Sequence, residues 1–188
     1  MPPLETARLL IRPFAEGDLP ALLGVLEVSG AEAEAATERY VRHGALNAVV
    51  LRELEQPPYG DRALVLRETG ELIGAAGLVP AYAPFDQLRR IDEQPPRPRP
   101  ATPHRPEVGL FYHVHPDHRS HGYATEAARA LVEFAFGPMQ LGHIVATTER
   151  DNLASQAVMR HLGMRMHENA LDEPAWFQLV GILEAGAV

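Results

Sequence analysis

The chain has 188 residues, of which 46% are hydrophobic and 22% are charged, so it can bury a substantial core within one domain. It contains no cysteine, which excludes disulfides, cysteine-ligated zinc and thiol catalysis and permits a cytoplasmic location. The formal net charge of −8 argues against a nucleic-acid partner and is compatible with amines or basic peptides as substrates. No signal peptide and no apolar run of roughly 18 residues is recognisable, so no membrane association is expected.

The first elements expected are a strand and a helix. Residues 5–14 suggest a strand that places Leu9 and Ile11 on the same face. Asp18 is well placed to cap a helix that begins at Leu19, because a short carboxylate can accept from the first backbone N–H groups of a helix. The chain is therefore predicted to pass from a strand into a helical region.

The next region predicts helices, a hairpin and a loop. Residues 31–54 are rich in Ala, Glu, Arg and Leu, which favours one or two helices. Two apolar runs, 63–66 and 72–79, flank a glycine-containing turn and predict a hairpin. Residues 80–106 are rich in proline and arginine, and we expect a proline-rich insertion loop there. This loop is either an exposed connection or a flap over the substrate or a dimer arm.

The second half alternates strands and helices. The helix expected at 122–136 carries a stripe of small apolar residues, and the helix at 152–162 has Asn152 as its N-cap and Gly163 as its stop. The pattern predicts a single α/β domain, 1–188, with one strongly twisted mixed sheet. The strands of this half are expected at 108–114, 143–148, 164–167 and 176–183.

The turn between strand 108–114 and helix 122–136 has the features of a phosphate-binding site. The start of a helix offers unpaired N–H groups and a positive dipole end, which suit a phosphate. Gly122 lets the backbone approach a pyrophosphate closely, Ala124 keeps that approach clear, and Arg119 adds donors. The alternative is that Gly122 is simple punctuation before a helix.

Four blocks of the sequence, at residues 119–124, 5–13, 107–109 and 152–164, resemble the GNAT acetyltransferases, in the branch of the ribosomal-protein (Rim-like) N-acetyltransferases. Arg119-x-x-Gly122-x-Ala124 is similar to the family's Q/R-x-x-G-x-G/A signature. The other three blocks are Glu5-Thr6-x-Arg8-Leu9-x-x-Arg12-Pro13, Glu107-Val108-Gly109, and Asn152-x-x-Ser155 followed by Gly163-Met164. The resemblance covers nearly the whole chain except the proline-rich stretch.

The resemblance implies a GNAT fold, with helices flanking the sheet and strands splayed at an acetyl-CoA site. It implies transfer of the acetyl group to a primary amine, on a protein N-terminus or a small molecule, by direct attack without an acyl-enzyme. It also suggests a homodimer. The residues expected to bind acetyl-CoA are Tyr112, His113, Val114, Arg119, Ser120, His121, Gly122, Tyr123, Ala124, Thr125, Asn152 and Ser155.

The catalytic groups are less well defined. Glu107 is the first candidate for the base that deprotonates the amine, although a strand-end carboxylate can equally be held in a salt bridge. His113 and His115 compete for this role, because imidazole titrates near neutral pH. Many GNAT enzymes have a tyrosine acid where this chain has Met159, so Ser155 is the expected proton donor, unless the thiolate leaves without an acid.

Two further readings follow from these residues. A metal site is one interpretation of the four histidines around the turn, His113, His115, His118 and His121. Their spacing is not one typical of zinc ligands, so no metal is predicted. The missing tyrosine at Met159 allows a second function, a regulatory module of GNAT fold that binds acyl-CoA without turnover.

Overall fold

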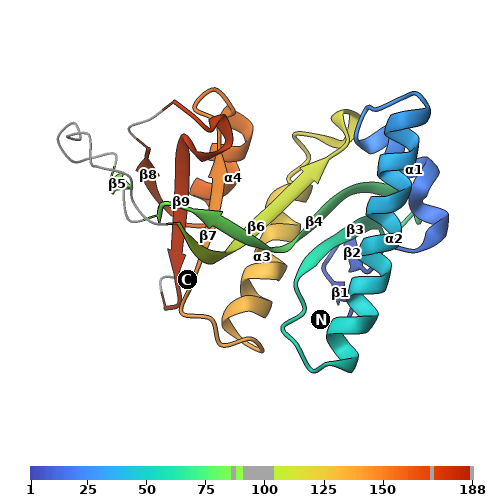
Figure 1. The fold of residues 1–188 in the computed structure, drawn as a ribbon, viewed down its shortest axis with the longest axis horizontal. Coiled ribbons are helices and arrows are strands. Elements are labelled where there is room, and N and C mark those ends of the chain that lie inside the picture. Colours follow the sequence, from blue (N-terminus) through green and yellow to red (C-terminus); the bar gives the residue numbers. More distant parts are fainter. Residues whose placement is uncertain (86–87, 91–103, 170–171, 187–188) are drawn as a thin grey trace. The chain divides into compact units, whose positions relative to one another are not determined.

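The computed structural model describes residues 1–85, 88–90, 104–169 and 172–186. Its strands form one sheet, with nine strands among the described residues in the order β1-β2-β3-β4-β6-β7-β9-β8-β5 (Figure 1). The sheet is mixed, because β6 and β7 run parallel while the other pairs with a recorded register are antiparallel. The predicted α/β fold with a mixed sheet and flanking helices is confirmed.

The chain divides into two compact units, each described by itself below. Unit 1 comprises Met1–Val79 and Phe111–Phe134, and unit 2 comprises Pro80–Leu110 and Ala135–Val188. Three elements contribute to both units: β4 (Leu72–Ala83), β6 (Arg105–Val114) and α3 (Tyr123–Phe136).

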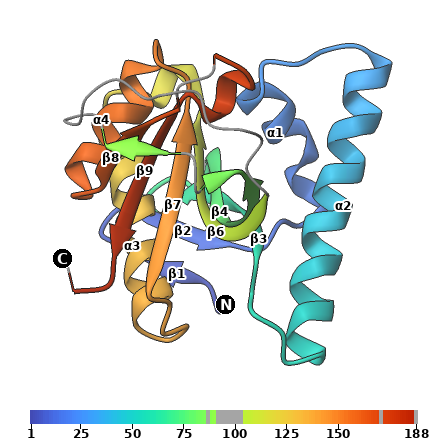
Figure 2. The same cartoon turned by 60° about the vertical axis from the view of Figure 1, so that its left-hand side comes forward.

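Unit 1 begins with a small antiparallel sheet covered by two helices. Its remaining elements are β1 (Leu4–Glu5), β2 (Leu9–Arg12), η1 (Glu16–Asp18), α1 (Leu19–Val25), α2 (Ala31–Glu53), β3 (Gly60–Leu66) and η3 (Pro116–His118). Leu9 and Ile11 are fully buried on the same face of β2, as the alternation predicted. Helix α2 lies alongside β3 (Figure 2), and Phe14, Val41 and Ala63 are part of the core between helices and strands.

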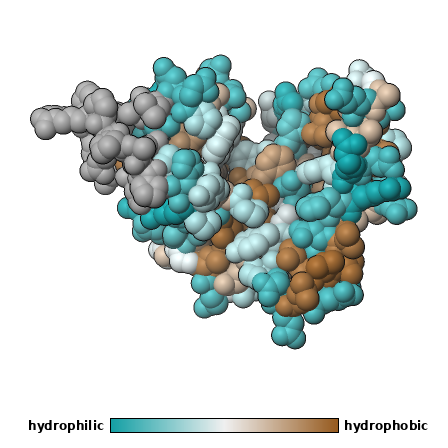
Figure 3. Space-filling model, viewed as in Figure 1, coloured by the Kyte–Doolittle hydropathy of each residue, from teal (hydrophilic) through white to brown (hydrophobic). Residues whose placement is uncertain are grey.

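The region predicted as one or two helices forms a single long helix with an exposed apolar stripe. In Figure 3 the surface over the C-terminal half of α2 is brown, and the residues exposed there are Leu46, Val49, Val50 and Leu54. Leu46, Val50 and Leu54 recur every fourth residue and Val49 lies three residues after Leu46, which places all four on one side of the helix. No helix in the part of the chain that the structure describes is long and apolar enough to cross a membrane.

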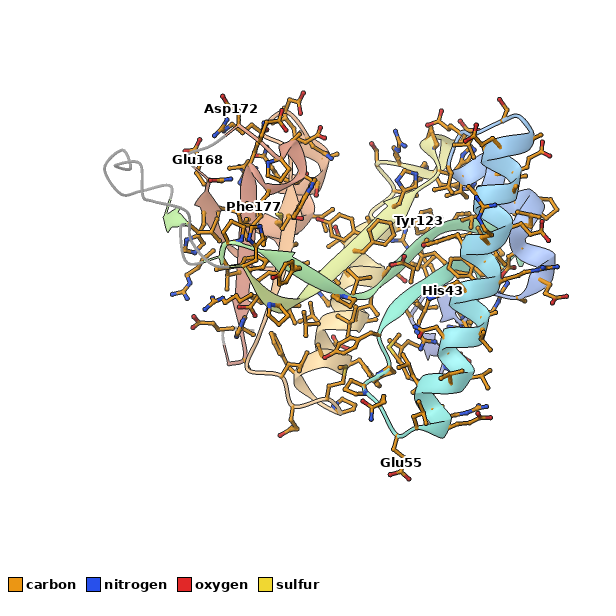
Figure 4. The ribbon with its side chains drawn as sticks, in the orientation of Figure 1. His43, Glu55, Tyr123, Glu168, Asp172 and Phe177 are labelled. Atoms are coloured by element: carbon orange, nitrogen blue, oxygen red, sulfur yellow. The ribbon has the colours of Figure 1, made fainter. Side chains whose placement is uncertain are left out.

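Unit 2 is built around the antiparallel pairs β7–β9 and β8–β9. Its remaining elements are β5 (Arg89–Arg90), β7 (His143–Thr148), α4 (Leu153–His161), β8 (Arg165–Glu168), η4 (Ala175–Phe177) and β9 (Leu179–Glu184). Helix α4 contacts β7 and β8, and Phe177 is fully buried in a cluster with Val145 and Val180. Figure 4 shows the Phe177 ring within this unit.

Helix α4 ends where its sequence predicted. Gly163 has φ of +79°, its N–H donates to Arg160 O (3.0 Å), and the Met164 N–H donates to Met159 O (3.0 Å). These two bonds form a Schellman motif, which satisfies carbonyl groups that the helix end would otherwise leave unpaired. The left-handed backbone explains why glycine stands here.

Several boundaries differ from the sequence predictions. The ends of the stretch expected to be a loop are strand: residues 80–83 continue β4, and Arg105 and Pro106 begin β6. Residues 86–87 and 91–103 of that stretch lie outside the described residues. Trp176 was expected in a strand, but it lies in the short helix η4, and β9 begins only at Leu179.

The predicted cap of α1 is wrong in its contacts. The Asp18 side chain makes no capping bond to α1 and instead receives two bonds of 2.7 Å from the Arg12 guanidinium and one from the Ala15 N–H. Burial alone would raise the pKa of Asp18, but the bonds from Arg12 and Ala15 outweigh it and hold that pKa below its usual value. Asp18 therefore fastens the end of β2 to the turn that leads into α1.

We predict that Asp18→Asn lowers the free energy of unfolding by about 1–3 kcal/mol at pH 7, because the charge-assisted bonds to Arg12 are lost. A lowered folded-state pKa contributes stability above the unfolded value near 3.8, and this contribution is lost as pH falls through the folded pKa. Urea unfolding from pH 7 to pH 3 measures both effects, and the variant should lose less stability on acidification than the wild type.

The matched control is Glu38→Gln, which breaks the exposed pair between Glu38 and Arg42 on α2. Such exposed pairs contribute little, so this change should lower stability by no more than about 0.5 kcal/mol. Equal stability losses in the two variants would contradict the role assigned to Asp18.

Candidate functional site

The turn after β6 has a backbone that few sequences can adopt. Pro116 to His118 form one turn of 3-10 helix, and then Ser120 and Gly122 take left-handed conformations with φ of +63° and +79°. A left-handed conformation is accessible to glycine at little cost and is uncommon for serine. These two residues reverse the chain so that α3 can begin at Tyr123.

The N-terminus of α3 is open to a ligand. The Glu126 N–H donates to Gly122 O (3.0 Å), so Gly122 closes the first turn of the helix. The N–H groups of Tyr123, Ala124 and Thr125 have no acceptor within the helix, as at any helix start. A Cβ added at the exposed Gly122 would meet only Arg8 Nη2, at 3.6 Å. The backbone is therefore accessible from the solvent side, as a phosphate-binding turn requires.

The polar side chains of the turn are largely engaged in holding it. Arg119 donates from Nε to Val114 O (3.0 Å), and its Nη2 lies 3.8 Å from Glu27 Oε2. His121 Nδ1 lies 2.7 Å from Arg119 O, and His118 Nε2 lies 3.1 Å from Glu71 Oε1. Any contact from Arg119 to a phosphate must therefore come from the terminal guanidinium nitrogens.

The end of β6 carries three of the residues expected to bind acetyl-CoA, Tyr112, His113 and Val114, and their backbones point in different directions. The His115 N–H donates to Ile73 O (2.8 Å), and His113 O lies so close to Gly74 of β4 that a Cβ there would be 2.3 Å away. Because backbone groups alternate in direction along a strand, those of Tyr112 and Val114 point away from β4. The backbone of Tyr112 and the Val114 N–H therefore point away from β4, whereas Val114 O accepts from Arg119 Nε and the backbone of His113 faces the neighbouring strand.

The two histidines considered as alternative bases have protein partners. His113 Nε2 lies 3.1 Å from Val25 O at the end of α1. His115 Nδ1 accepts from the Asp117 N–H (3.2 Å), in the turn rather than in the strand. These contacts give both imidazoles a structural role, and they make each histidine a weaker candidate for the catalytic base.

Within unit 2, Glu107 is held by two cationic or polar partners. Its carboxylate lies 2.6 Å from His143 Nε2 and 2.9 Å from Arg105 Nε, and its side chain is 11% exposed. The salt-bridge alternative for Glu107 is thus present in the structure. His143 had no part in the sequence predictions, although the parallel register that pairs Gly109 with Val145 places Glu107 opposite His143.

The N-terminus of α4 has the geometry expected of it. Asn152 Oδ1 accepts from the Ser155 N–H (3.0 Å), so its prediction as N-cap is confirmed. Ser155 is half-buried in the first turn of α4. Met159 is fully buried, with its Sδ 3.3 Å from the position of a Cβ on Gly181, which confirms it as core filler.

The loop between β7 and α4 is fixed by Arg150, which the sequence analysis did not single out. Its guanidinium donates to Glu168 Oε1 (2.9 Å) and Asn169 O (2.8 Å) and also contacts Asp172. Figure 4 marks Glu168 and Asp172, which come from β8 and from the segment after it. The Arg150 carbonyl accepts from buried Gln156, so this network also anchors α4.

The structure places the turn residues in unit 1 and Glu107, Asn152 and Ser155 in unit 2. Among the described ranges, no group of three His, Cys, Asp or Glu side chains is arranged to hold a metal ion. The contribution of the N-terminal segment was missed: Thr6 and Arg8 were part of a family resemblance, yet both contact Glu126 near the turn.

This chain is similar to acetyltransferases in both sequence and structure. The chain is 29% identical over 166 residues to YnaD, an uncharacterized N-acetyltransferase of Bacillus subtilis, covering 86% of this chain and 82% of the relative. The structure resembles an acetyltransferase from Agrobacterium tumefaciens with a TM-score of 0.66 and 25% identity, covering 98% and 95% of the two chains.

A third neighbour shares the fold at lower identity. It is RimL, a ribosomal L7/L12 α-N-protein acetyltransferase solved with coenzyme A, with a TM-score of 0.62, 14% identity and coverage of 97% of both chains. Residues 8–165 match the family described as the acetyltransferase (GNAT) domain. This chain is therefore a member of the GNAT family and an acyl-CoA-dependent N-acetyltransferase.

Proposed function

We propose that this protein transfers the acetyl group of acetyl-CoA to a primary amine by direct attack in a ternary complex. The observation that carries the proposal is the turn before α3, where left-handed Gly122 leaves the helix start open to a pyrophosphate. Helix dipole and first-turn N–H groups favour an anion there. The backbone of Tyr112 and the Val114 N–H, which point away from β4, are the proposed partners of pantetheine, since Val114 O already accepts from Arg119 Nε.

The proposed reaction needs few side chains. The amine nitrogen attacks the thioester carbonyl carbon, the carbon–sulfur bond breaks, and the thiolate leaves as coenzyme A after taking a proton. A preorganised backbone N–H near the end of β6 would stabilise the oxyanion that forms on the carbonyl. The absence of cysteine from the sequence agrees with direct transfer, since no cysteine acyl-enzyme can form.

The acceptor is proposed to be a protein N-terminus or a small-molecule amine. Support for a protein N-terminus comes from the Rim-like sequence blocks and from the shared fold of RimL, whose own substrate is ribosomal L7/L12. The net charge of −8 favours approach of a cationic amine. A cytoplasmic location, a homodimer and the lack of a metal remain parts of this proposal.

Glu107 is the proposed base, although it is also a structural carboxylate. His143 and Arg105 keep it fixed, and a base must hold one position to take a proton from an amine. Ser155 is the proposed hydrogen-bond donor to the leaving thiolate, at the start of a helix whose dipole favours negative charge. Buried Met159 cannot serve as an acid, which leaves Ser155 or no acid at all.

The first experiment tests the activity itself. We expect thiol release from acetyl-CoA to depend on an added amine when the purified protein is given a panel of peptides with free N-termini, amino acids, polyamines and aminoglycosides. Calorimetry with coenzyme A should show saturable binding. Tight binding without thiol release for any amine would favour the regulatory acyl-CoA module, and absence of binding would overturn both functions.

Gly122→Ala tests the position of the pyrophosphate. The added methyl group stands at the helix start where the phosphate would approach, so we predict that coenzyme A binds at least about tenfold more weakly by calorimetry. Gly163→Ala is the matched control, because Gly163 has the same φ of +79° and nothing within 4 Å of its added Cβ.

The two glycine variants share the backbone strain of a left-handed alanine, so their stabilities should fall alike. A selective loss of coenzyme A affinity in Gly122→Ala therefore reports on the ligand and not on the fold. If both variants keep the wild-type affinity, the turn is not where the pyrophosphate binds.

Glu107→Gln and Ser155→Ala test the chemistry. Glutamine keeps the shape of the side chain but cannot accept the proton, so we predict that kcat falls about 10²-fold while the affinity for coenzyme A changes little. Ser155→Ala should likewise lower kcat more than affinity, and by less than Glu107→Gln. Steady-state kinetics beside calorimetry measure the two quantities.

The control for Glu107 is His143→Asn, which removes a partner of the carboxylate without removing the carboxylate itself. If Glu107 is only a salt-bridge residue, Glu107→Gln and His143→Asn will lower thermal stability and kcat in parallel. A large fall in kcat for Glu107→Gln alone would support the base.

A further inference from the structure

The N-terminal segment is fastened to the first turn of α3 through one carboxylate. Glu126 Oε1 accepts from Thr6 Oγ1 (2.6 Å) and from the Arg8 N–H (2.9 Å), and Glu126 Oε2 accepts from Arg8 Nε (2.7 Å). Arg8 Nη2 also lies 2.7 Å from Glu126 Oε2. Two side chains and one backbone group thus converge on Glu126 across more than a hundred residues of sequence.

Arg8 also reaches the turn itself. Its Nη1 donates to His121 O (3.0 Å), and its guanidinium carbon lies 4.5 Å from the centre of the Tyr123 ring. The Tyr123 ring, marked in Figure 4 beside the start of α3, stacks with the imidazole of His121 at 5.8 Å. Every nitrogen of the Arg8 guanidinium therefore has an acceptor in the helix start or in the turn before it.

The bond to His121 O lies between two residues whose backbone is left-handed. His121 stands between Ser120 and Gly122, the two residues with left-handed conformations. A non-glycine residue in that region persists only when its surroundings over-determine it. The bond from Arg8 and the stacked Tyr123 ring supply such restraints on one side of the turn.

Arg8 also balances the negative charge of Glu126. Burial alone would raise the pKa of Glu126, but the hydrogen bonds from Thr6 and Arg8 outweigh it and hold that pKa below its usual value, so the group is a carboxylate at neutral pH. An uncompensated carboxylate in the first turn of α3 would repel a pyrophosphate at the same helix start. The Arg8 guanidinium compensates that charge.

We propose that Arg8, together with Thr6, is a positioning residue for acetyl-CoA: it fixes Glu126 and the His121 carbonyl so that turn 119–125 is preformed for the pyrophosphate. This inference rests on the proposed function, since it assigns a role within the same turn. Arg8 acts through the turn rather than on the phosphate, because its donors are directed at Glu126 and His121.

The chain supplies a matched arginine for the test. Arg67 donates to Thr6 O and pairs with Glu5, so it also holds the N-terminal segment, and both of these partners lie outside the turn and α3. The side chains of Arg8 and Arg67 are 47% and 46% exposed. Loss of either removes an arginine from the same segment, and only the loss of Arg8 releases the turn.

We expect Arg8→Met to weaken coenzyme A binding by at least about tenfold in calorimetry and to raise KM for acetyl-CoA, with kcat at saturation nearly unchanged. Hydrogen exchange of the backbone amides of residues 119–125, measured without ligand, should become faster. Arg67→Met should leave affinity, KM and exchange at these amides as in the wild type, with a similar small change in Tm.

Arg8→Lys separates position from charge. Lysine keeps the positive charge but lacks the planar fork that serves Glu126 and His121 together, so it should bind coenzyme A as weakly as Arg8→Met. Recovery of affinity in Arg8→Lys would overturn the positioning role and leave charge compensation alone. Equal losses in Arg8→Met and Arg67→Met would reduce Arg8 to an anchor of the N-terminal segment.

The inference and the proposed function fail separately. If the wild type binds coenzyme A and Arg8→Met binds it equally well, only the role of Arg8 is wrong. If the wild type does not bind coenzyme A, the proposed function fails, while the exchange rates of residues 119–125 still show whether Arg8 holds the turn.

Discussion

The passage from β6 into α3 is the constraint on which the candidate site depends. The chain must leave an extended strand and start a helix while keeping that start accessible, and it does so through left-handed Ser120 and Gly122. Arg119 donates a hydrogen bond to Val114 O at the end of the strand, and Arg8 donates one to His121 O in the turn. The accessible helix start thus depends on a backbone conformation that the side chains of Arg119 and Arg8 both hold.

A second constraint operates in unit 2, where the parallel pairing of β6 with β7 decides the surroundings of Glu107. The register that places Gly109 beside Val145 brings His143 to the carboxylate. The same contact can steady a base or simply satisfy a charge, because both roles need the carboxylate to be fixed. Kinetics separate the two roles, because loss of a base lowers kcat whereas loss of a structural carboxylate lowers stability.

Most of the elements followed from local patterns. Alternation placed Leu9 and Ile11 correctly, and the Asn152 cap and Gly163 stop of α4 were right because they depend on neighbouring backbone groups only. The prediction for Asp18 was wrong because the Arg12 guanidinium, at the end of the preceding strand, binds the carboxylate in place of the helix N–H groups. Strand ends at 80–83 and 105–106 were missed because proline there was taken to exclude pairing.

The sequence by itself determined the fold class and the GNAT family, and it predicted the turn at Gly122, because short motifs and apolar periodicity lie in neighbouring residues. Only the tertiary structure decided the contacts between distant segments. It joined Thr6 and Arg8 to Glu126, and His143 to Glu107, through pairings of strands and helices that no spacing along the chain encodes. The backbone conformation of a residue depends largely on its sequence neighbours, whereas the partner of a side chain depends on how distant segments pack together.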